Sequence, residues 1–139
     1  MLSNNCSDSL FFSFNKIQQL MSELTIYHLK TCSTCKRIIN ELTLPSKTNL
    51  KCIKEIRISL NELEKMRALS GSYESLFSKR SQKYKALGLK EKKLSEHELK
   101  DLILKEYTFL KRPVFMFEDG IYIGNSKKTI ALLKENKNL

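Results

Sequence analysis

Two cysteines with two residues between them form the segment best suited to chemistry. The segment is Cys32-Ser33-Thr34-Cys35, and apolar residues follow at positions 35, 38, 39 and 42, the spacing of one helix face. Cys32 therefore falls just before the first turn of a predicted helix, where free backbone N–H groups and the helix dipole stabilise an anion. Because the thiolate is the reactive form of cysteine, the pattern predicts that Cys32 is a nucleophile.

Cys35 lies in phase with the buried face of the same helix, which makes it less accessible than Cys32. A protected thiol beside a reactive one is suited to resolving a mixed disulfide or a sulfenate formed on Cys32. Lys36, in the first turn, would add positive charge near the thiolate. The pair therefore predicts redox chemistry.

Three other uses of the two cysteines are open. A zinc site would need two more ligands, but Cys52 has no cysteine partner nearby, and His28 and His97 lack ligand-like spacing. A disulfide across two residues closes too small a loop to add much stability. The third alternative is a pair of unreactive core cysteines. The position of the motif between a strand and a helix favours redox chemistry over all three.

A proline stands directly before the last strongly apolar segment of the chain. Pro113 follows Lys111-Arg112 and precedes residues 114–117. Proline is tolerated at the first position of a strand, so it needs no functional explanation. The other interpretation is a cis-proline loop facing the cysteines, in which Arg112 would bind an anion or lower the pKa of the thiolate.

The first half of the chain alternates between strand and helix signals. A β-branched and aromatic run at 24–29 predicts a strand that leads into the cysteine helix. That helix ends at Pro45-Ser46, and a second strand is predicted at 50–56. The order is therefore β, α, β.

Two capping boxes mark a helical block in the middle of the chain. Ser59 with Glu62, and Ser95 with Glu98, have the spacing in which each side chain satisfies a free backbone N–H of the other residue. Gly88 ends a shorter helix between them. We predict several successive helices at about 59–107.

The chain then returns to the sheet. Consecutive apolar residues at 114–117 predict a buried strand, and Asp119-Gly120 predicts a hairpin to a return strand at 122–123. A last helix is predicted at 126–135. The predicted fold is therefore α/β and thioredoxin-like, with a mixed four-stranded sheet and a helical insertion. We expect residues 21–139 to form this single domain, after a disordered or dispensable extension at 1–20.

Composition agrees with one globular domain in a reducing, cytoplasmic setting. The 139 residues carry a net charge of +10, and no apolar run approaches the ~20 residues of a membrane span. A lone CxxC without a signal peptide suggests the cytosol. Much of the positive charge lies at 76–93. This segment is either a solvated face or a surface for anionic partners. Direct nucleic-acid binding is not expected, because no groove-reading motif accompanies it.

Residues 21 to about 134 resemble the family that contains glutaredoxin-coupled arsenate reductases (ArsC) and the redox-sensing regulators called Spx. Four segments carry the resemblance: Tyr27-His28-Leu29-Lys30-Thr31-Cys32-Ser33-Thr34-Cys35-Lys36, Leu76-Phe77-Ser78-Lys79-Arg80-Ser81, Tyr84-Lys85-Ala86-Leu87-Gly88-Leu89 and Leu110-Lys111-Arg112-Pro113-Val114. Their order and spacing fit the family. The resemblance implies a thioredoxin-like fold and a cis peptide bond before Pro113.

The resemblance also implies a function. In arsenate reductases of this family the first cysteine attacks the oxyanion, arginines hold it, and a thiol completes the cycle. The electron donor would be glutathione, a glutaredoxin or a thioredoxin, with no bound cofactor and no metal. Cys32 and Cys35 are the candidate catalytic residues. The candidate residues for binding the substrate, a small oxyanion or a thiol, are Thr34, Lys36, Arg80, Arg112 and Pro113.

Some positions resemble the regulator branch more closely. Ser78 and the segment 123–125 stand where the reductases have arginines, and Ser78-Lys79-Arg80-Ser81 is similar to the regulators' Ser-Thr-Arg-Ser. Gly71 lies near a glycine with which those regulators contact the RNA polymerase α-subunit. A redox-switched regulator that binds RNA polymerase is therefore the alternative to an arsenate-reductase-like oxidoreductase.

Overall fold

One mixed four-stranded sheet forms the centre of the computed structural model, which describes residues 23–139. The predicted extension at 1–20 lies outside the described residues. The strand order is β2-β1-β3-β4; β1 is parallel to β2 and antiparallel to β3, and β4 is antiparallel to β3. The strands are β1 (Thr25–His28), β2 (Asn49–Cys52), β3 (Val114–Met116) and β4 (Ile121–Ile123). The predicted thioredoxin-like arrangement is confirmed.

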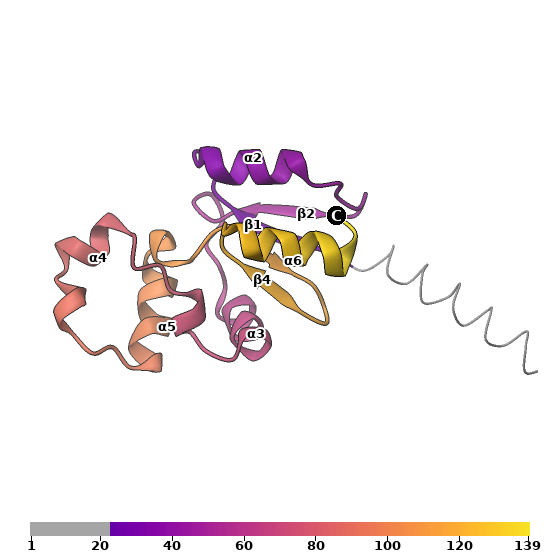
Figure 1. Cartoon of the computed structure of the whole chain (residues 1–139). Helices are drawn as coiled ribbons and strands as arrows, with labels where there is room; N and C mark the ends of the chain where they lie inside the picture. Colours follow the sequence, from indigo (N-terminus) through magenta and orange to yellow (C-terminus); the bar gives the residue numbers. More distant parts are fainter. Residues whose placement is uncertain (1–22) are drawn as a thin grey trace, which may run out of the picture.

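Both faces of the sheet are covered, which explains the nearly continuous apolar character of its central strands. Helices α2 (Ser33–Glu41) and α6 (Lys127–Lys137) pack with Ile26 and Phe115 on one face (Figure 1). Helix α3 (Leu60–Ser70) packs on the other face. Alternate residues along β1 and β3 therefore enter two separate core clusters.

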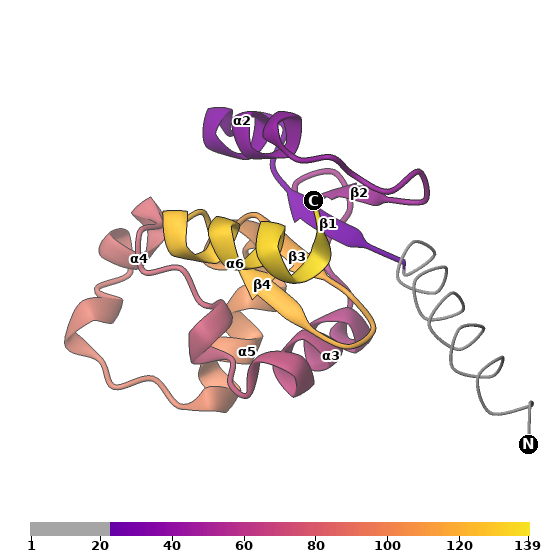
Figure 2. The same ribbon diagram turned by 45° about the vertical axis from the view of Figure 1, so that its right-hand side comes forward.

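The predicted helical insertion is present between β2 and β3. After α3 it contains α4 (Gln82–Ala86) and α5 (Glu96–Lys105), with short 3-10 turns at Glu74–Leu76, Leu89–Glu91 and Tyr107–Phe109. Figure 2 shows this helical part beside the sheet, on the side where α6 begins.

An antiparallel bridge between Phe77 and Leu110 joins the two ends of the segment 78–109, the part of the insertion that follows α3. The Ser78 N–H donates to the Phe109 carbonyl at 2.6 Å, and the Lys111 N–H donates to the Leu76 carbonyl at 2.8 Å. The two ends of the segment 78–109 therefore lie side by side, directly before Arg112.

Both predicted capping boxes are confirmed, at the starts of α3 and α5. The box of α3 has tertiary contacts as well: Glu62 forms an ion pair with Lys51 of β2 and accepts a hydrogen bond from the Tyr27 hydroxyl at 3.0 Å. Tyr27 is only 2% exposed. This carboxylate therefore links α3 to two strands, whereas Glu98 bonds only within its own box.

The predicted strand at 50–56 is too long. The strand ends at Cys52, because the amides of Glu55 and Ile56 donate to the Cys52 carbonyl and turn the chain. The Asp119-Gly120 hairpin is confirmed, with the Phe117 N–H donating to the Gly120 carbonyl at 2.9 Å. No helix among residues 23–139 is long and apolar enough to cross a membrane.

Candidate active site

Cys32 occupies the N-cap position of α2, as the sequence predicts. Burial raises the pKa of its thiol. The backbone N–H groups of Cys35 and Thr34 and the side chains of Cys35 and Arg112 lower the pKa by more than burial raises it, so the resulting pKa lies below the ordinary value of a cysteine. These groups lower the pKa as hydrogen-bond donors to the sulfur, because a donor stabilises the thiolate more than the neutral thiol. The site therefore favours a thiolate at Cys32.

Cys35 has the opposite character. It is completely buried, and this burial, together with the neighbouring Cys32 sulfur, raises the pKa of Cys35 to about 11. Cys35 is therefore a protonated thiol at neutral pH, directly behind the more exposed Cys32. The two residues differ in both access and charge, which suits an attacking and a resolving thiol.

The peptide bond between Arg112 and Pro113 is cis, as the family resemblance implies. Pro113 is buried at the start of β3, and its carbonyl accepts a hydrogen bond from the Gly124 N–H at 2.9 Å. The Arg112 side chain is partly exposed and is one of the groups that lower the Cys32 pKa. The loop therefore sets a guanidinium beside the nucleophile.

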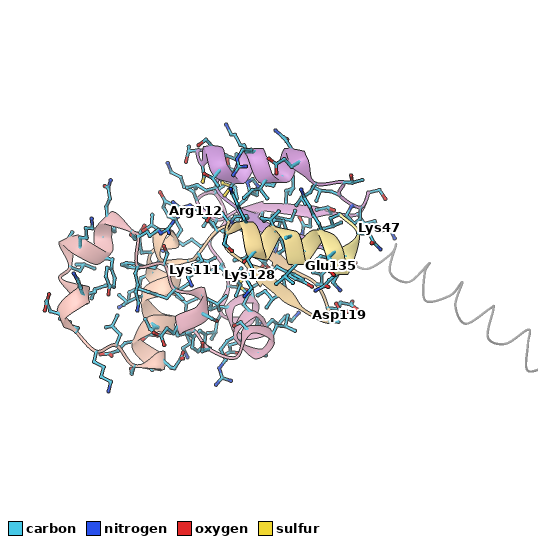
Figure 3. The ribbon with its side chains drawn as sticks, in the orientation of Figure 1. Lys47, Lys111, Arg112, Asp119, Lys128 and Glu135 are labelled. Carbon is cyan, nitrogen blue, oxygen red and sulfur yellow. The ribbon has the colours of Figure 1, made fainter. Side chains whose placement is uncertain are left out.

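An open groove of about 900 Å³ leads to Cys32. Its walls come from the segment 72–80 that follows α3, from Lys111 and Arg112, and from the β4–α6 connection at 123–129. Figure 3 labels Lys111 and Arg112 on the segment that returns from the insertion to the sheet. Both α2 and α6 begin on the side of the sheet nearest the insertion (Figure 1).

Three predicted site residues share this groove: Cys32, Arg80 and Arg112. The other predicted residues take different places. Cys35 and Pro113 are buried, and Thr34 faces Cys32 through its backbone N–H. Lys36 does not line the groove; its backbone N–H donates to the Cys32 carbonyl, and its side chain is exposed on α2.

The prediction missed several groove residues. Lys111 lines the groove, and so does Lys79, whose ammonium lies 3.7 Å from a Glu74 carboxylate oxygen. Ser126 and Thr129, at the start of α6, form part of the opposite wall. Lys111 could have been found as the neighbour of Arg112, but the two α6 residues have no local signal that connects them to Cys32.

The charged and polar side chains in this groove suit an anion or a polar chain, not a metal ion. Within residues 23–139, no three His, Cys, Asp or Glu side chains lie close enough together to hold a metal. Arg80, Lys111 and Arg112 form no ion pair with any carboxylate of the same range, so their charges are available to an anionic ligand beside Cys32.

Comparisons with known proteins agree with this geometry. A model of the ArsC family matches residues 27–133. A Streptococcus mutans protein described as a possible arsenate reductase is 30% identical, with a TM-score of 0.64; the match covers 76% of this chain and 92% of that protein. A Staphylococcus aureus protein solved by NMR is 27% identical, with a TM-score of 0.64 over 81% and 96% of the two chains.

More distant structures share the fold alone. An arsenate reductase from Vibrio cholerae is 18% identical, with a TM-score of 0.67 over 81% of this chain and 97% of that one. A search of curated proteins finds no match.

Proposed function

Because the chain belongs to the ArsC family, whose members are thiol-dependent oxidoreductases, we propose that it reduces its substrate through Cys32. Arg112 would hold the thiolate and an anionic substrate group, and Cys35 or an external thiol would resolve the intermediate. The observation that carries the proposal is the pairing of thiols: Cys32 has a lowered pKa at the end of a cationic groove, with a protonated Cys35 behind it.

The chemistry follows from the two thiols. With an oxyanion such as arsenate, Cys32 would form a sulfur–arsenic bond with loss of water. Attack of a second thiol on the Cys32 sulfur would break that bond, leaving two electrons on arsenic as arsenite and a disulfide on the protein. Glutathione, a glutaredoxin or a thioredoxin would then reduce this disulfide. With a disulfide substrate, the same two attacks release two thiols.

The groove holds fewer arginines than the arsenate reductases of the resemblance would place there. Ser78 and Gly124 both line it, at the positions where arginines were expected. Arg80 and Arg112 remain as candidate oxyanion ligands. Arsenate is therefore one candidate substrate, and disulfides are the others.

The test is reductant-dependent turnover with arsenate, a low-molecular-weight disulfide and a glutathionylated protein, each with glutathione, glutaredoxin and thioredoxin as donor. We expect Cys32→Ser to abolish turnover with the substrate that wild type accepts. Cys52→Ser is the matched control, because Cys52 is buried at the end of β2, outside the groove, and should keep the activity. If wild type is as inactive as Cys32→Ser on every substrate, the proposed function is lost.

A redox-switched regulator is the second candidate. It is favoured by the exposed lysines of the insertion, among them Lys85, Lys90 and Lys93, and by Gly71, which is exposed at the end of α3 with open space around its Cα. The C-terminal domain of the RNA polymerase α-subunit is the partner to test, in a pull-down with the reduced and the oxidised protein. Binding that does not depend on the Cys32–Cys35 redox state would contradict this function.

A further inference from the structure

We propose that the substrate of this site is a disulfide carried by an acidic polypeptide, and that the polypeptide lies in the groove that leads to Cys32. This inference rests on the proposed function, because it needs Cys32 as the nucleophile. The groove would select the substrate by its size and its negative charge.

The size of the groove argues for a ligand larger than an inorganic anion. An oxyanion of five heavy atoms needs roughly 75 Å³ if each atom takes the ~15 Å³ of cavity volume that holds one water molecule. The groove has a volume of about 900 Å³. This volume is in the range of sites that bind much larger ligands. Ser78 has a short side chain and Gly124 has none, which leaves this space open.

The charge of the groove argues for an acidic ligand. Arg80, Lys111 and Arg112 line it, and none of the three is paired with a carboxylate of residues 23–139. Lys79 is only loosely paired with Glu74, and both side chains are more than 60% exposed. Glu74 is the one acidic residue among the described lining residues, against four cations. Such a field attracts carboxylates and raises their rate of encounter with Cys32.

The remaining wall suits a polypeptide. Ser78 and Asn125 place a hydroxyl and a carboxamide among the residues that line the groove. A hydroxyl and an amide of this kind can pair with peptide N–H and carbonyl groups. A nucleic acid would offer no group for a thiolate to attack. It would also find no stacking platform, since the lining aromatic ring, Phe77, is 1% exposed.

The reaction is a two-step exchange. The Cys32 thiolate attacks the peptide sulfur of the substrate disulfide, forms a mixed disulfide with the peptide, and expels the other thiolate. Cys35 then loses its proton and attacks the Cys32 sulfur, releasing the peptide thiolate, which takes a proton. The substrate gains two electrons, the protein gains a Cys32–Cys35 disulfide, and an external dithiol of the thioredoxin or glutaredoxin class reduces it.

The experiment uses two short peptides of equal length, each with one cysteine in a mixed disulfide with thionitrobenzoate, a coloured leaving group. One peptide carries glutamates around the cysteine and the other carries lysines. Thionitrobenzoate release by the reduced full-length protein is followed by stopped flow at low ionic strength. We expect the acidic peptide to react about tenfold faster or more, and high salt to shrink the ratio. A neutral small disulfide serves as the reference for every variant.

Charge reversal locates the effect. Lys79→Glu/Lys111→Glu should remove or invert the preference for the acidic peptide. Lys93→Glu/Lys134→Glu makes the same change in net charge at exposed positions outside the groove and should keep it. Equal rates of wild type with the two peptides would overturn the inference while leaving Cys32 reactivity, and so the proposed function, intact. Equal effects of the two double variants would also overturn it. No reaction with any disulfide would instead overturn the proposed function.

Discussion

Replacing Glu62 by glutamine should destabilise the protein far more than the same change in its local counterpart, Glu98. Glu62 belongs to the capping box of α3, but it also pairs with Lys51 and accepts a hydrogen bond from the buried Tyr27 hydroxyl. Partial burial raises the pKa of Glu62, yet Lys51, the Ser59 N–H and the Tyr27 hydroxyl together lower it from 4.5 to about 2. The carboxylate is therefore bound more tightly than the carboxylic acid.

The magnitude follows from the pKa. Each pKa unit corresponds to about 1.4 kcal/mol, so the fall from 4.5 to about 2 is worth about 3 kcal/mol. The Glu62 side chain is 20% exposed, so solvent screening reduces this only modestly. We expect Glu62→Gln to lose roughly 2–3 kcal/mol at neutral pH, partly because the Tyr27 hydroxyl loses its charged partner.

The sign of the pH dependence is fixed. The pKa is lower in the folded state, so the stabilisation is complete above about pH 5 and is lost as the pH falls toward about 2. The difference in unfolding free energy between wild type and Glu62→Gln should therefore shrink by about 2 kcal/mol between pH 7 and pH 3. Comparing the two proteins cancels the titration of the other carboxylates.

Urea denaturation followed by far-UV circular dichroism is the assay, since the chain has no tryptophan and urea does not screen ion pairs. Glu98→Gln is the control: Glu98 forms the same capping box at the start of α5, is exposed, and bonds only to Ser95. Its effect should be much smaller. Equal losses in the two variants, or a wild-type advantage that is the same at pH 7 and pH 3, would contradict the role assigned to the Glu62 carboxylate.

Two further predictions concern the thiols. Iodoacetamide should modify Cys32 at least tenfold faster than Cys35 at pH 8, because a pKa of about 11 leaves roughly one thousandth of Cys35 as thiolate. Peptide mass spectrometry identifies the modified cysteines. Faster modification of Cys35 would contradict the assignment of Cys32 as the nucleophile. Arg112→Gln should raise the Cys32 pKa and move its alkylation profile to higher pH, with Arg112→Lys moving it less. Lys36→Gln, outside the groove, should not move the profile, and an identical effect of the Lys36 and Arg112 changes would exclude a specific role for Arg112.

The elements that the sequence predicts well depend on residues close together in the chain. The two capping boxes, the Asp119-Gly120 hairpin and the position of Cys32 before α2 each involve contacts within a few residues. The predicted end of β2 is wrong because the apolar pattern continues past Cys52. In the structure the backbone turns there, and the amides of Glu55 and Ile56 donate to the Cys52 carbonyl. Periodicity cannot detect that competition.

The site itself is only partly visible in the sequence. Cys32 and Arg112 come together because β1 and β3 are neighbours, which the predicted topology already implies. Ser126 and Thr129 reach the groove only through the packing of α6 against the sheet, and no pattern in the chain marks them as partners of Cys32. Lys36 is near Cys32 in sequence, but its side chain does not line the groove, and its part in binding an anion stays a prediction.

The bridge between Phe77 and Leu110 makes residues 78–109 a closed loop with fixed ends. The entropy lost in closing a flexible loop rises only with the logarithm of its length, so doubling the length costs about 0.6 kcal/mol. The distal part of this loop can therefore be lengthened or shortened at little cost, while the bridge keeps Arg112 at its distance from Cys32. Diversity of length and sequence can accumulate at the exposed connections of the insertion without disturbing the geometry of the reacting thiol, whereas its core residues, such as Leu99 and Ile103, are constrained by packing.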